Sequence, residues 1–317
     1  MARIVSVGAA LQDVFLMDHD DFGTNKKGFF NQFELGAKID IDKIHFSTGG
    51  GATNAATTFA RYGHESIFMG CIADDPAGQA VINVLDREGI DASYVTYTDK
   101  CHTGYSVVLL TPGGERTILT CRGASAKFDL LHARELKNIN PDWLYVTNMR
   151  GDMNKLDEFF SEAHRNNCKV MFNPGMLELS HKKQFTGLLA DVDVLLVNKT
   201  EAKEIVPGNS LKELAGRLHG IVPNVIVTDG QNGAIAFSEG RGYRIGLYED
   251  PPLVDSTGAG DAFGSGFLAA FAAGKSFKDS LIFAAANSTS VIRHIGSKTG
   301  ILTNHTKLHN MPMEEII

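Results

Sequence analysis

Residues 255–267 read Asp-Ser-Thr-Gly-Ala-Gly-Asp-Ala-Phe-Gly-Ser-Gly-Phe, a combination of glycines, hydroxyls and carboxylates that suits phosphate chemistry. A short apolar run, Pro251 to Val254, precedes them, and a long run of small and apolar residues follows. This layout predicts a strand, a tight glycine turn and the start of a helix. The first N–H groups of such a helix have no partner within it, so they attract a phosphate.

Asp261 lies at the same place as the predicted anion site. A phosphate repels a carboxylate, so the presence of this side chain needs a chemical reason. A carboxylate that takes the proton from a hydroxyl attacking phosphorus provides one. The pattern therefore favours a phosphoryl-transfer enzyme with Asp261 as its base.

A second glycine cluster, Gly49-Gly50-Gly51, is followed closely by Asn54. Successive glycines let a ligand approach the backbone, and an asparagine can donate to and accept from hydroxyl groups. The alternative is a flexible turn before an ordinary helix. The cluster lacks the Gly-x-Gly-x-x-Gly spacing of a dinucleotide site.

Three further polar clusters follow predicted strands, and each allows two interpretations. Asp13 can meet a polar ligand or cap a turn. Asn198 and Glu201 can hold Mg²⁺ through waters, or they can form the capping box of a helix. The run Thr228 to Gly233 can hold phosphates through backbone amides and a hydroxyl, or it can be a plain turn.

Helical and strand-like stretches alternate after residue 50. The sequence predicts helices at 53–62, 78–88, 155–166 and 211–219, and strands at 66–71, 143–146, 169–172, 194–197 and 225–228. This alternation implies an α/β fold with a mostly parallel central sheet flanked by helices. Ligands in such folds collect beyond the carboxyl ends of the strands.

Two stretches break the alternation, residues 14–48 and 103–121. The second predicts a hairpin, with strands at 104–110 and 116–120 joined by a Pro-Gly-Gly-Glu turn. We expect both stretches to form a small antiparallel β lid that excludes water from the site. The alternative is a surface sheet that extends the domain. The large domain would then comprise residues 1–13, 49–102 and 122–317, and the open lid edges suggest a homodimer.

The composition is that of an ordinary globular protein, because 43% of the 317 residues are hydrophobic and 21% are charged. The net charge of −7 argues against a nucleic-acid partner. Four scattered cysteines, at positions 71, 101, 121 and 168, indicate reduced thiols in a cytoplasmic protein. No apolar stretch reaches the length of a membrane span, so we expect no membrane partner.

Together, the two glycine clusters and the Asn-x-x-Glu element between them resemble the ribokinase-like (PfkB) family of carbohydrate kinases. The resemblance spans nearly the whole chain. It implies a ribokinase-like, Rossmann-like three-layer fold, and transfer of the γ-phosphoryl group of ATP, with Mg²⁺, to a hydroxymethyl group. The implied acceptor is a ribose- or fructose-like monosaccharide.

The resemblance also implies roles for individual residues. Asp261 would be the catalytic base and the backbone of Gly258, Ala259 and Gly260 the anion hole, while Asp13, Gly49, Gly50 and Asn54 would bind substrate. The nucleotide would lie along Thr228, Gly230 and Gly233, with Asn287 near the adenine. Asn198 and Glu201 would organise Mg²⁺ and its waters, and Asp255 and Thr257 fall where some members bind K⁺.

The charge of the acceptor is harder to predict. Some members that act on sugar phosphates carry a lysine within the first glycine motif, and residues 49–54 contain none, which favours a neutral acceptor. Basic residues elsewhere keep a phosphate in reach: Lys38, Arg116, Arg122, Lys127 and Arg150. A nucleoside kinase is the first alternative, and a sugar or nucleotide sensor without turnover is the second. Asp261 argues against the sensor.

Overall fold

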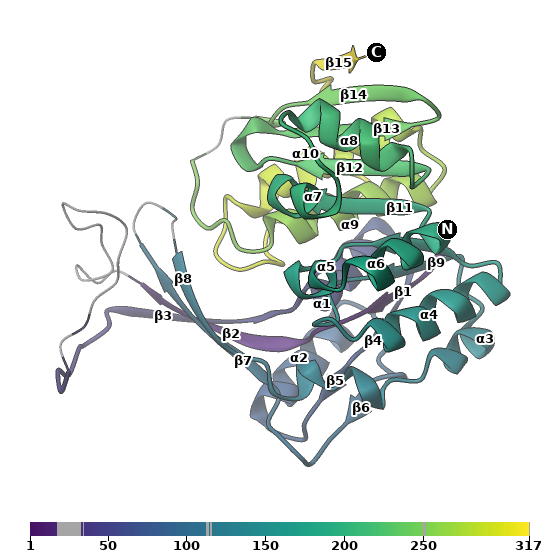
Figure 1. Cartoon of the computed structure of the whole chain (residues 1–317). Coiled ribbons are helices and arrows are strands. Elements are labelled where there is room, and N and C mark those ends of the chain that lie inside the picture. Colours follow the sequence, from purple (N-terminus) through teal and green to yellow (C-terminus); the bar gives the residue numbers. More distant parts are fainter. Residues whose placement is uncertain (18–32, 34, 112–113, 115, 250–251, 317) are drawn as a thin grey trace.

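A nine-stranded sheet forms the centre of the molecule in the computed structural model, which describes residues 1–17, 33, 35–111, 114, 116–249 and 252–316 (Figure 1). The strands are, in spatial order, β15 (Met313–Ile316), β14 (Arg241–Ile245), β13 (Ala234–Ser238), β12 (Asn224–Thr228), β11 (Val194–Asn198), β10 (Lys169–Phe172), β9 (Trp143–Val146), β1 (Arg3–Val7) and β4 (Glu65–Met69). β12, β11, β10, β9, β1 and β4 run parallel, and β13, β14 and β15 extend the sheet antiparallel.

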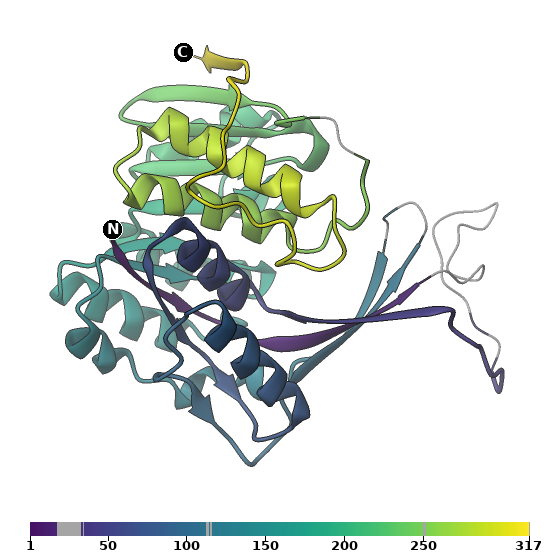
Figure 2. The same ribbon diagram turned by 180° about the vertical axis from the view of Figure 1, so that it is seen from behind.

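Both faces of the sheet are covered by helices, because the parallel strands are apolar on both sides. Neighbouring residues of β1 belong to different cores: Ile4 packs on one face and Val5 on the other. The first face carries α1 (Gly51–Tyr62), α9 (Ala259–Ala272) and α10 (Phe277–Val291), which lie together in Figure 2. The opposite face carries α3 (Leu136–Ile139), α4 (Met153–Arg165), α5 (Met176–Ser180), α6 (Lys182–Leu188), α7 (Lys199–Ile205) and α8 (Leu211–His219).

Capping side chains fix where several helices begin. Asp75 precedes α2 (Pro76–Arg87) and accepts a hydrogen bond from the N–H of Gly78. Asp152, Ser210 and Ser276 do the same at the starts of α4, α8 and α10. Each cap satisfies one of the N–H groups that a helix start leaves unpaired.

The predicted elements agree with the structure where the local pattern was strong. The strands at 143–146 and 169–172 and the helix at 211–219 have the predicted bounds. The predicted strand at 66–71 is divided into β4 and β5 (Cys71–Ile72), which pairs with β6 (Thr96–Tyr97).

The predicted strand at 251–254 is wrong in its described part. Residues 252–254 form no strand, and the N–H groups of Val254 and Asp255 both bond to the carbonyl of Ile292 at the end of α10. Pro252 has no N–H to give to a sheet ladder. The loop that leads to α9 is therefore held by α10.

A separate four-stranded sheet, in the order β3-β2-β7-β8, extends away from the helices (Figure 1). Its strands are β2 (Leu11–Met17), β3 (Lys43–Gly49), β7 (Gly104–Leu110) and β8 (Arg116–Cys121). The β2–β3 and β7–β8 pairs are antiparallel, as predicted, and the central β2–β7 pair is parallel. Parts of the predicted lid, residues 18–32, 34, 112, 113 and 115, lie outside the described residues.

The small sheet has two different faces. Asp13 shares one face with Ser47, Ser106 and Thr120, its partners across the strands. The other face carries Ile44, Phe46 and Leu119, whose exposed fractions are 56%, 57% and 58%. Among the described helices, none is both long and apolar enough to span a membrane.

Candidate active site

The start of α9 has the open geometry that an anion site needs. Gly258 precedes the helix with a φ of 79°, and a Cβ at this position would lie 2.4 Å from the Cβ of Ser297. Only glycine fits that backbone and that space. Within the described part of the chain, the N–H groups of Gly260 and Asp261 have no hydrogen-bond partner. They are free to bind an anion.

Asp261 lies in the first turn of α9 and is held from one side. The amide Nδ2 of Asn54, on α1, donates to Asp261 Oδ2 at 2.8 Å. A Cβ at Gly51 would lie 3.1 Å from Asp261 Oδ1, so the glycine keeps a space open beside this second oxygen. Burial raises the pKa of Asp261, and the Asn54 hydrogen bond and the Lys298 charge oppose that rise.

The orientation of the Asn54 amide is fixed by Lys298, a residue that sequence analysis did not select. Lys298 Nζ donates to Asn54 Oδ1 at 2.7 Å, to the carbonyl of Thr48 at 2.7 Å and to Thr53 Oγ1 at 3.0 Å. Ser297 Oγ also donates to Asn54 Oδ1, at 2.8 Å. Two donors on Oδ1 leave only Nδ2 to face Asp261. Asn54 therefore presents an N–H, not an acceptor, to Asp261.

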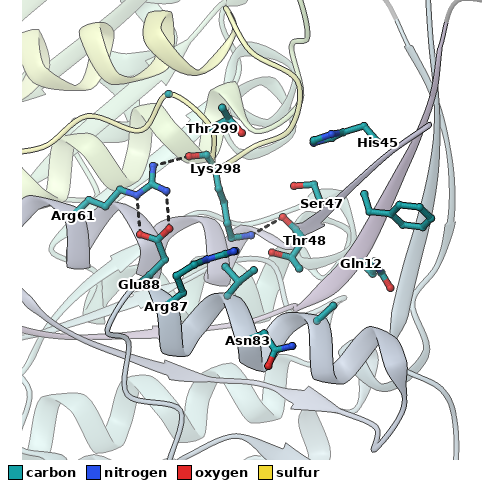
Figure 3. Close-up of a pocket in the computed structure, with 14 residues that line it drawn as sticks. Gln12, His45, Ser47, Thr48, Arg61, Asn83, Arg87, Glu88, Lys298 and Thr299 are labelled. Carbon is teal, nitrogen blue, oxygen red and sulfur yellow. Dashed lines mark hydrogen bonds and ion pairs between the residues drawn. The ribbon is translucent and has the colours of Figure 1, made fainter. Parts of the chain in front are cut away.

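Lys298 is buried, and burial lowers the pKa of its ammonium to about 8. The charges of Asp13 and Asp261 oppose this shift. The Arg61 guanidinium binds the carbonyl of Lys298 at 2.9 Å and the Glu88 carboxylate at 2.7 and 2.8 Å. Figure 3 shows this anchor, with the ammonium pointing to Thr48. Lys298 is thus held both at its ammonium group and at its backbone carbonyl.

A cavity of about 540 Å³ lies beside this anchor, lined by residues that include Gln12, Arg87 and Thr299 (Figure 3). Gln12 neighbours Asp13 on β2, so its side chain points to the opposite face of the small sheet. Ser47, the cross-strand partner of Asp13, also lines the cavity, which therefore adjoins the space around Asp13.

Asp13 is only 4% exposed, and burial raises its pKa to about 6. The Lys298 charge and a hydrogen bond from Ser106 oppose that rise. A Cβ at Gly49 would lie 2.1 Å from Asp13 Oδ2. Gly49 and Gly51 therefore leave the space between Asp13 and Asp261 free of side chains, as a bound ligand would require. We call the backbone of residues 49–51 that borders this space the glycine floor.

On the other side of the α9 start lies a cavity of about 350 Å³. Its lining brings together three groups of residues: Thr228, Gly230 and Gly233 after β12, Ala259, Gly260 and Phe263 on α9, and Ala285, Ser288 and Thr289 on α10. The sequence had indicated the first two groups separately. The structure places them around one space next to the free amides.

Asn198 and Glu201 form the capping box that was one of their two interpretations. Asn198 Oδ1 accepts from the N–H of Glu201 at 2.9 Å, and Glu201 Oε2 accepts from the N–H of Asn198 at 2.8 Å. Burial raises the pKa of Glu201. Both line a cavity of about 280 Å³ with Thr228 and Gly230. No group of three metal-binding side chains occurs among the described residues.

Asn287, expected near the adenine, is not among the residues that line the cavity of about 350 Å³. Its side chain is fully buried, with Nδ2 bound to the carbonyl of Ala262 at 2.8 Å and Oδ1 bound to the N–H of Leu302 at 2.9 Å. Both ends of the amide are used to join α9, α10 and the C-terminal segment. A ligand contact would require breaking these bonds.

Asp255 is fully buried and orders the loop before α9. Its carboxylate accepts from the N–H groups of Thr257 at 2.9 Å and Gly296 at 3.0 Å. Thr257 Oγ1 is buried and has no partner among the described residues. Arg116, on β8, reaches this loop and donates to Ser256 Oγ.

The family model for the pfkB family of carbohydrate kinases matches residues 1–304. A ribokinase of Haemophilus influenzae is 25% identical over 86% of this chain and 90% of its own length. An ATP-dependent 6-phosphofructokinase of Thermoanaerobacterium thermosaccharolyticum is 26% identical over 93% and 89%. An adenosine kinase of Schizophyllum commune is 24% identical over 75% and 77%.

Solved structures show the same fold. The Arabidopsis thaliana ribokinase complexed with ribose and ATP superposes with a TM-score of 0.78, at 22% identity over 96% of both chains. A putative ribokinase II of E. coli, in complex with ATP and Mg²⁺, gives a TM-score of 0.79 at 18% identity over 96% of both chains. The two-sheet architecture described above is therefore the ribokinase-like fold.

Proposed function

This chain belongs to the pfkB family of carbohydrate kinases and is a phosphotransferase with an alcohol group as acceptor, and we propose that it transfers the γ-phosphoryl group of ATP to a hydroxymethyl group of a monosaccharide. The observation that carries this proposal is the position of Asp261. Its oxygen Oδ1, which has no hydrogen-bond partner among the described residues, lies beside the glycine floor. The N–H groups of Gly260 and Asp261, also without a partner there, lie in the same helical turn.

In the proposed reaction, the acceptor hydroxyl lies over Gly51 and gives its proton to Asp261 Oδ1. Its oxygen forms a bond to the γ-phosphorus as the bond from that phosphorus to the β,γ-bridging oxygen breaks, which leaves ADP. The amides of residues 258–261 would stabilise the charge on the migrating group, chiefly those of Gly260 and Asp261, because the N–H of Ala259 donates to the carbonyl of Ser256 at 3.4 Å. The raised pKa of Asp261 makes this carboxylate a stronger base than an exposed aspartate.

The floor between the two carboxylates suits the acceptor. Asp13 and the backbone of Gly49 and Gly50 would bind its hydroxyls, and the remaining N–H of Asn54 would donate to it. Thr228, Gly230 and Gly233 would lie along the nucleotide, in the cavity next to the free amides. Asn287 would support this cavity from behind, since it joins α9 to α10.

Mg²⁺ would be held by Asn198 and Glu201 through waters, because the capping box already uses one oxygen of each side chain. The ion would neutralise charge on the transferred group. The buried, unpartnered hydroxyl of Thr257 is the kind of oxygen that a cation such as K⁺ binds. K⁺ at Asp255 and Thr257 is therefore part of the proposal.

The proposed domains are a small lid of residues 14–48 and 103–121 and a large domain of residues 1–13, 49–102 and 122–317. We also propose a homodimer through the lid. Its outer face exposes Ile44, Phe46 and Leu119 by more than half each, which a partner copy would cover. The proposed location is the cytoplasm, on the basis of the scattered free cysteines.

ADP release, measured with ATP, Mg²⁺ and a panel of acceptors, tests the function. Release that depends on ribose, fructose or a derivative of either supports the proposal. Release with adenosine or cytidine alone would instead indicate the nucleoside kinase, which the adenosine kinase relative makes the second candidate. Ligand-dependent thermal stabilisation without any ADP release would indicate a sensor.

A further inference from the structure

Two arginines flank the acceptor end of the proposed site. Arg122 directly follows β8, and a Cβ at Gly104 would lie 2.9 Å from the carbonyl oxygen of Arg122 and 3.0 Å from the Cβ of Leu11, two residues before Asp13 on β2. Burial lowers the pKa of the Arg122 guanidinium, the charge of Arg150 lowers it further, and the charge of Asp13 opposes this shift. Both arginine residues are exposed. Neither guanidinium has a hydrogen bond or ion pair among the described residues.

Arg150 is held in an unusual backbone conformation, with a φ of 55°. The N–H groups on either side of it, those of Met149 and Gly151, both donate to Glu178 Oε1, at 2.7 and 2.8 Å. Glu178 is fully buried, and its Oε2 accepts from the N–H of Gly175 at 2.8 Å. A buried carboxylate thus clamps the loop around Arg150. Strain that is stabilised in this way is typical of functional positions.

The loop that carries Arg150 begins at the floor of the site. Thr147 follows β9, and its Cγ2 would lie 3.0 Å from a Cβ at Gly51, next to Asp261. Arg150 comes three residues later. Arg122 reaches the same region from the base of the small sheet. Two segments far apart in the sequence therefore bring like charges together beside Asp13.

Two neighbouring guanidinium groups repel each other, and an anion between them removes that repulsion. Guanidinium groups match the two oxygens of a phosphate or carboxylate. Asp13 does not serve as this anion well, because its own carboxylate is buried and hydrogen-bonded to Ser106. The arginine pair therefore suits a negatively charged group on the ligand.

We propose that the acceptor is an anionic monosaccharide, a sugar phosphate or a sugar acid, whose charged group binds Arg122 and Arg150 while its hydroxymethyl group points to Asp261. This inference rests on the proposed function. It replaces the expectation of a neutral acceptor, which rested on the absence of a lysine at residues 49–54. The 6-phosphofructokinase relative shows that the family includes an enzyme named for a phosphorylated sugar.

The charged group belongs to the acceptor and not to ATP, because the two arginines lie at the Asp13 end of the floor. The cavity lined by Thr228 and Gly233 lies on the other side of the α9 start. The kinetics of variants separate these assignments, since an arginine that binds the acceptor changes the KM of the acceptor alone.

The experiment compares matched acceptors with the wild type and with Arg122→Gln, Arg150→Gln and the double variant. Fructose 6-phosphate is measured against fructose for the phosphate arm. For the carboxylate arm, 2-dehydro-3-deoxygluconate is measured against 3-deoxyfructose, in which a hydroxymethyl group replaces the carboxylate. Arg87→Gln is the charge-matched control, because Arg87 is exposed on α2 and lines the cavity of about 540 Å³ beside Lys298 (Figure 3).

We expect at least one anionic acceptor to exceed its neutral counterpart by about a hundredfold or more in kcat/KM. Each arginine variant should raise the KM of that acceptor by about tenfold or more, leave the KM of ATP unchanged and leave the neutral acceptor unaffected. Arg87→Gln should behave as the wild type.

Two results would overturn the inference and leave the proposed function intact. One is a neutral sugar that performs as well as the anionic acceptors. The other is an arginine pair whose variants raise the KM of ATP, or that of neutral and anionic acceptors alike. If no acceptor of either charge supports ADP release, the proposed function fails and the inference fails with it.

Discussion

The two sides of the α9 start differ in the types of residue that line them. On the proposed acceptor side, buried charged side chains are joined through a neutral amide: Asn54 bonds to Asp261, and Lys298 bonds to Asn54. On the proposed nucleotide side, the cavity is lined mostly by glycines, alanines and single hydroxyls. We therefore expect the nucleotide to bind chiefly through backbone and shape, and acceptor recognition and pH dependence to lie in the network of Asp261, Asn54 and Lys298.

The strongest test of this contrast is Asp261→Asn. The variant keeps the shape of the side chain and removes the base, so turnover should fall by about 10²–10⁴-fold or more. Binding of ATP, followed by thermal shift, should be preserved because the amides of the α9 start are unchanged. Turnover close to that of the wild type would show that another group takes the proton.

Lys298→Met tests whether the buried ammonium orients the acceptor side. The change removes the charged donor from Thr48 and Asn54 and leaves the Asn54 amide held at Oδ1 by Ser297, so its orientation toward Asp261 is less firmly fixed. We expect kcat/KM for the acceptor to fall about tenfold to a hundredfold, with the KM of ATP unchanged. Lys275→Met, at an exposed position three residues after the end of α9, is the control.

A second measurement distinguishes a loss of the positioning role in Lys298→Met from a loss of folding. The thermal midpoint and the ATP-dependent thermal shift are measured on the same preparations. A folded variant with normal acceptor kinetics would exclude the positioning role. A rise in the KM of ATP equal to that for the acceptor would also argue against it.

The pH dependence should be confined to the acceptor side. Asp13 has a pKa of about 6, so below that pH it becomes protonated and no longer accepts two hydrogen bonds from the acceptor. We expect kcat/KM for the acceptor to fall about tenfold per pH unit below the pKa of this group. The KM of ATP, measured at saturating acceptor, should stay level across the same range.

The alkaline limb should follow Lys298, whose pKa is about 8. Above that pH the ammonium loses its proton and the charge that stabilises the Asp13 and Asp261 carboxylates. In the Lys298→Met variant the alkaline limb should disappear. Its persistence would assign the limb to another group.

The smallest effect is expected on the nucleotide side. Thr228→Val keeps the shape of the side chain and removes one hydroxyl from the cavity lining. The KM of ATP should rise only about twofold to tenfold, with the acceptor kinetics unchanged. A loss as large as that of Lys298→Met would show that side chains matter equally on both sides.

The sequence predicted the elements whose signals are local. The alternating runs gave β9, β10 and α8 their bounds, and the glycine turn before Asp261 predicted the start of α9. Each of these depends on residues within a few positions of one another. The strand predicted at 251–254 failed because Val254 and Asp255 bond to Ile292, a partner that a local pattern does not reveal.

The charged network could not be predicted in the same way. Lys298 and Asn54 are separated by 244 positions, and nothing in the local sequence pairs them. The one available signal was weak: a lysine between glycines at 296 and 300. The sequence also left open whether Asn198 and Glu201 form a capping box, and it did not indicate that Arg122 and Arg150 belong together. Only the fold decides both points.

The path of the chain from β1 to β2 has a kinetic consequence. Only Gly8, Ala9 and Ala10 separate the last residue of the central β1 strand from the first residue of the small sheet, and Asp13 lies on that sheet. Asp13 is the last residue before the proposed lid at 14–48, so the carboxylate that would bind the acceptor and the lid share one strand, β2. We therefore expect a movement of the proposed lid to shift Asp13 as well, which would couple lid opening to release of the product.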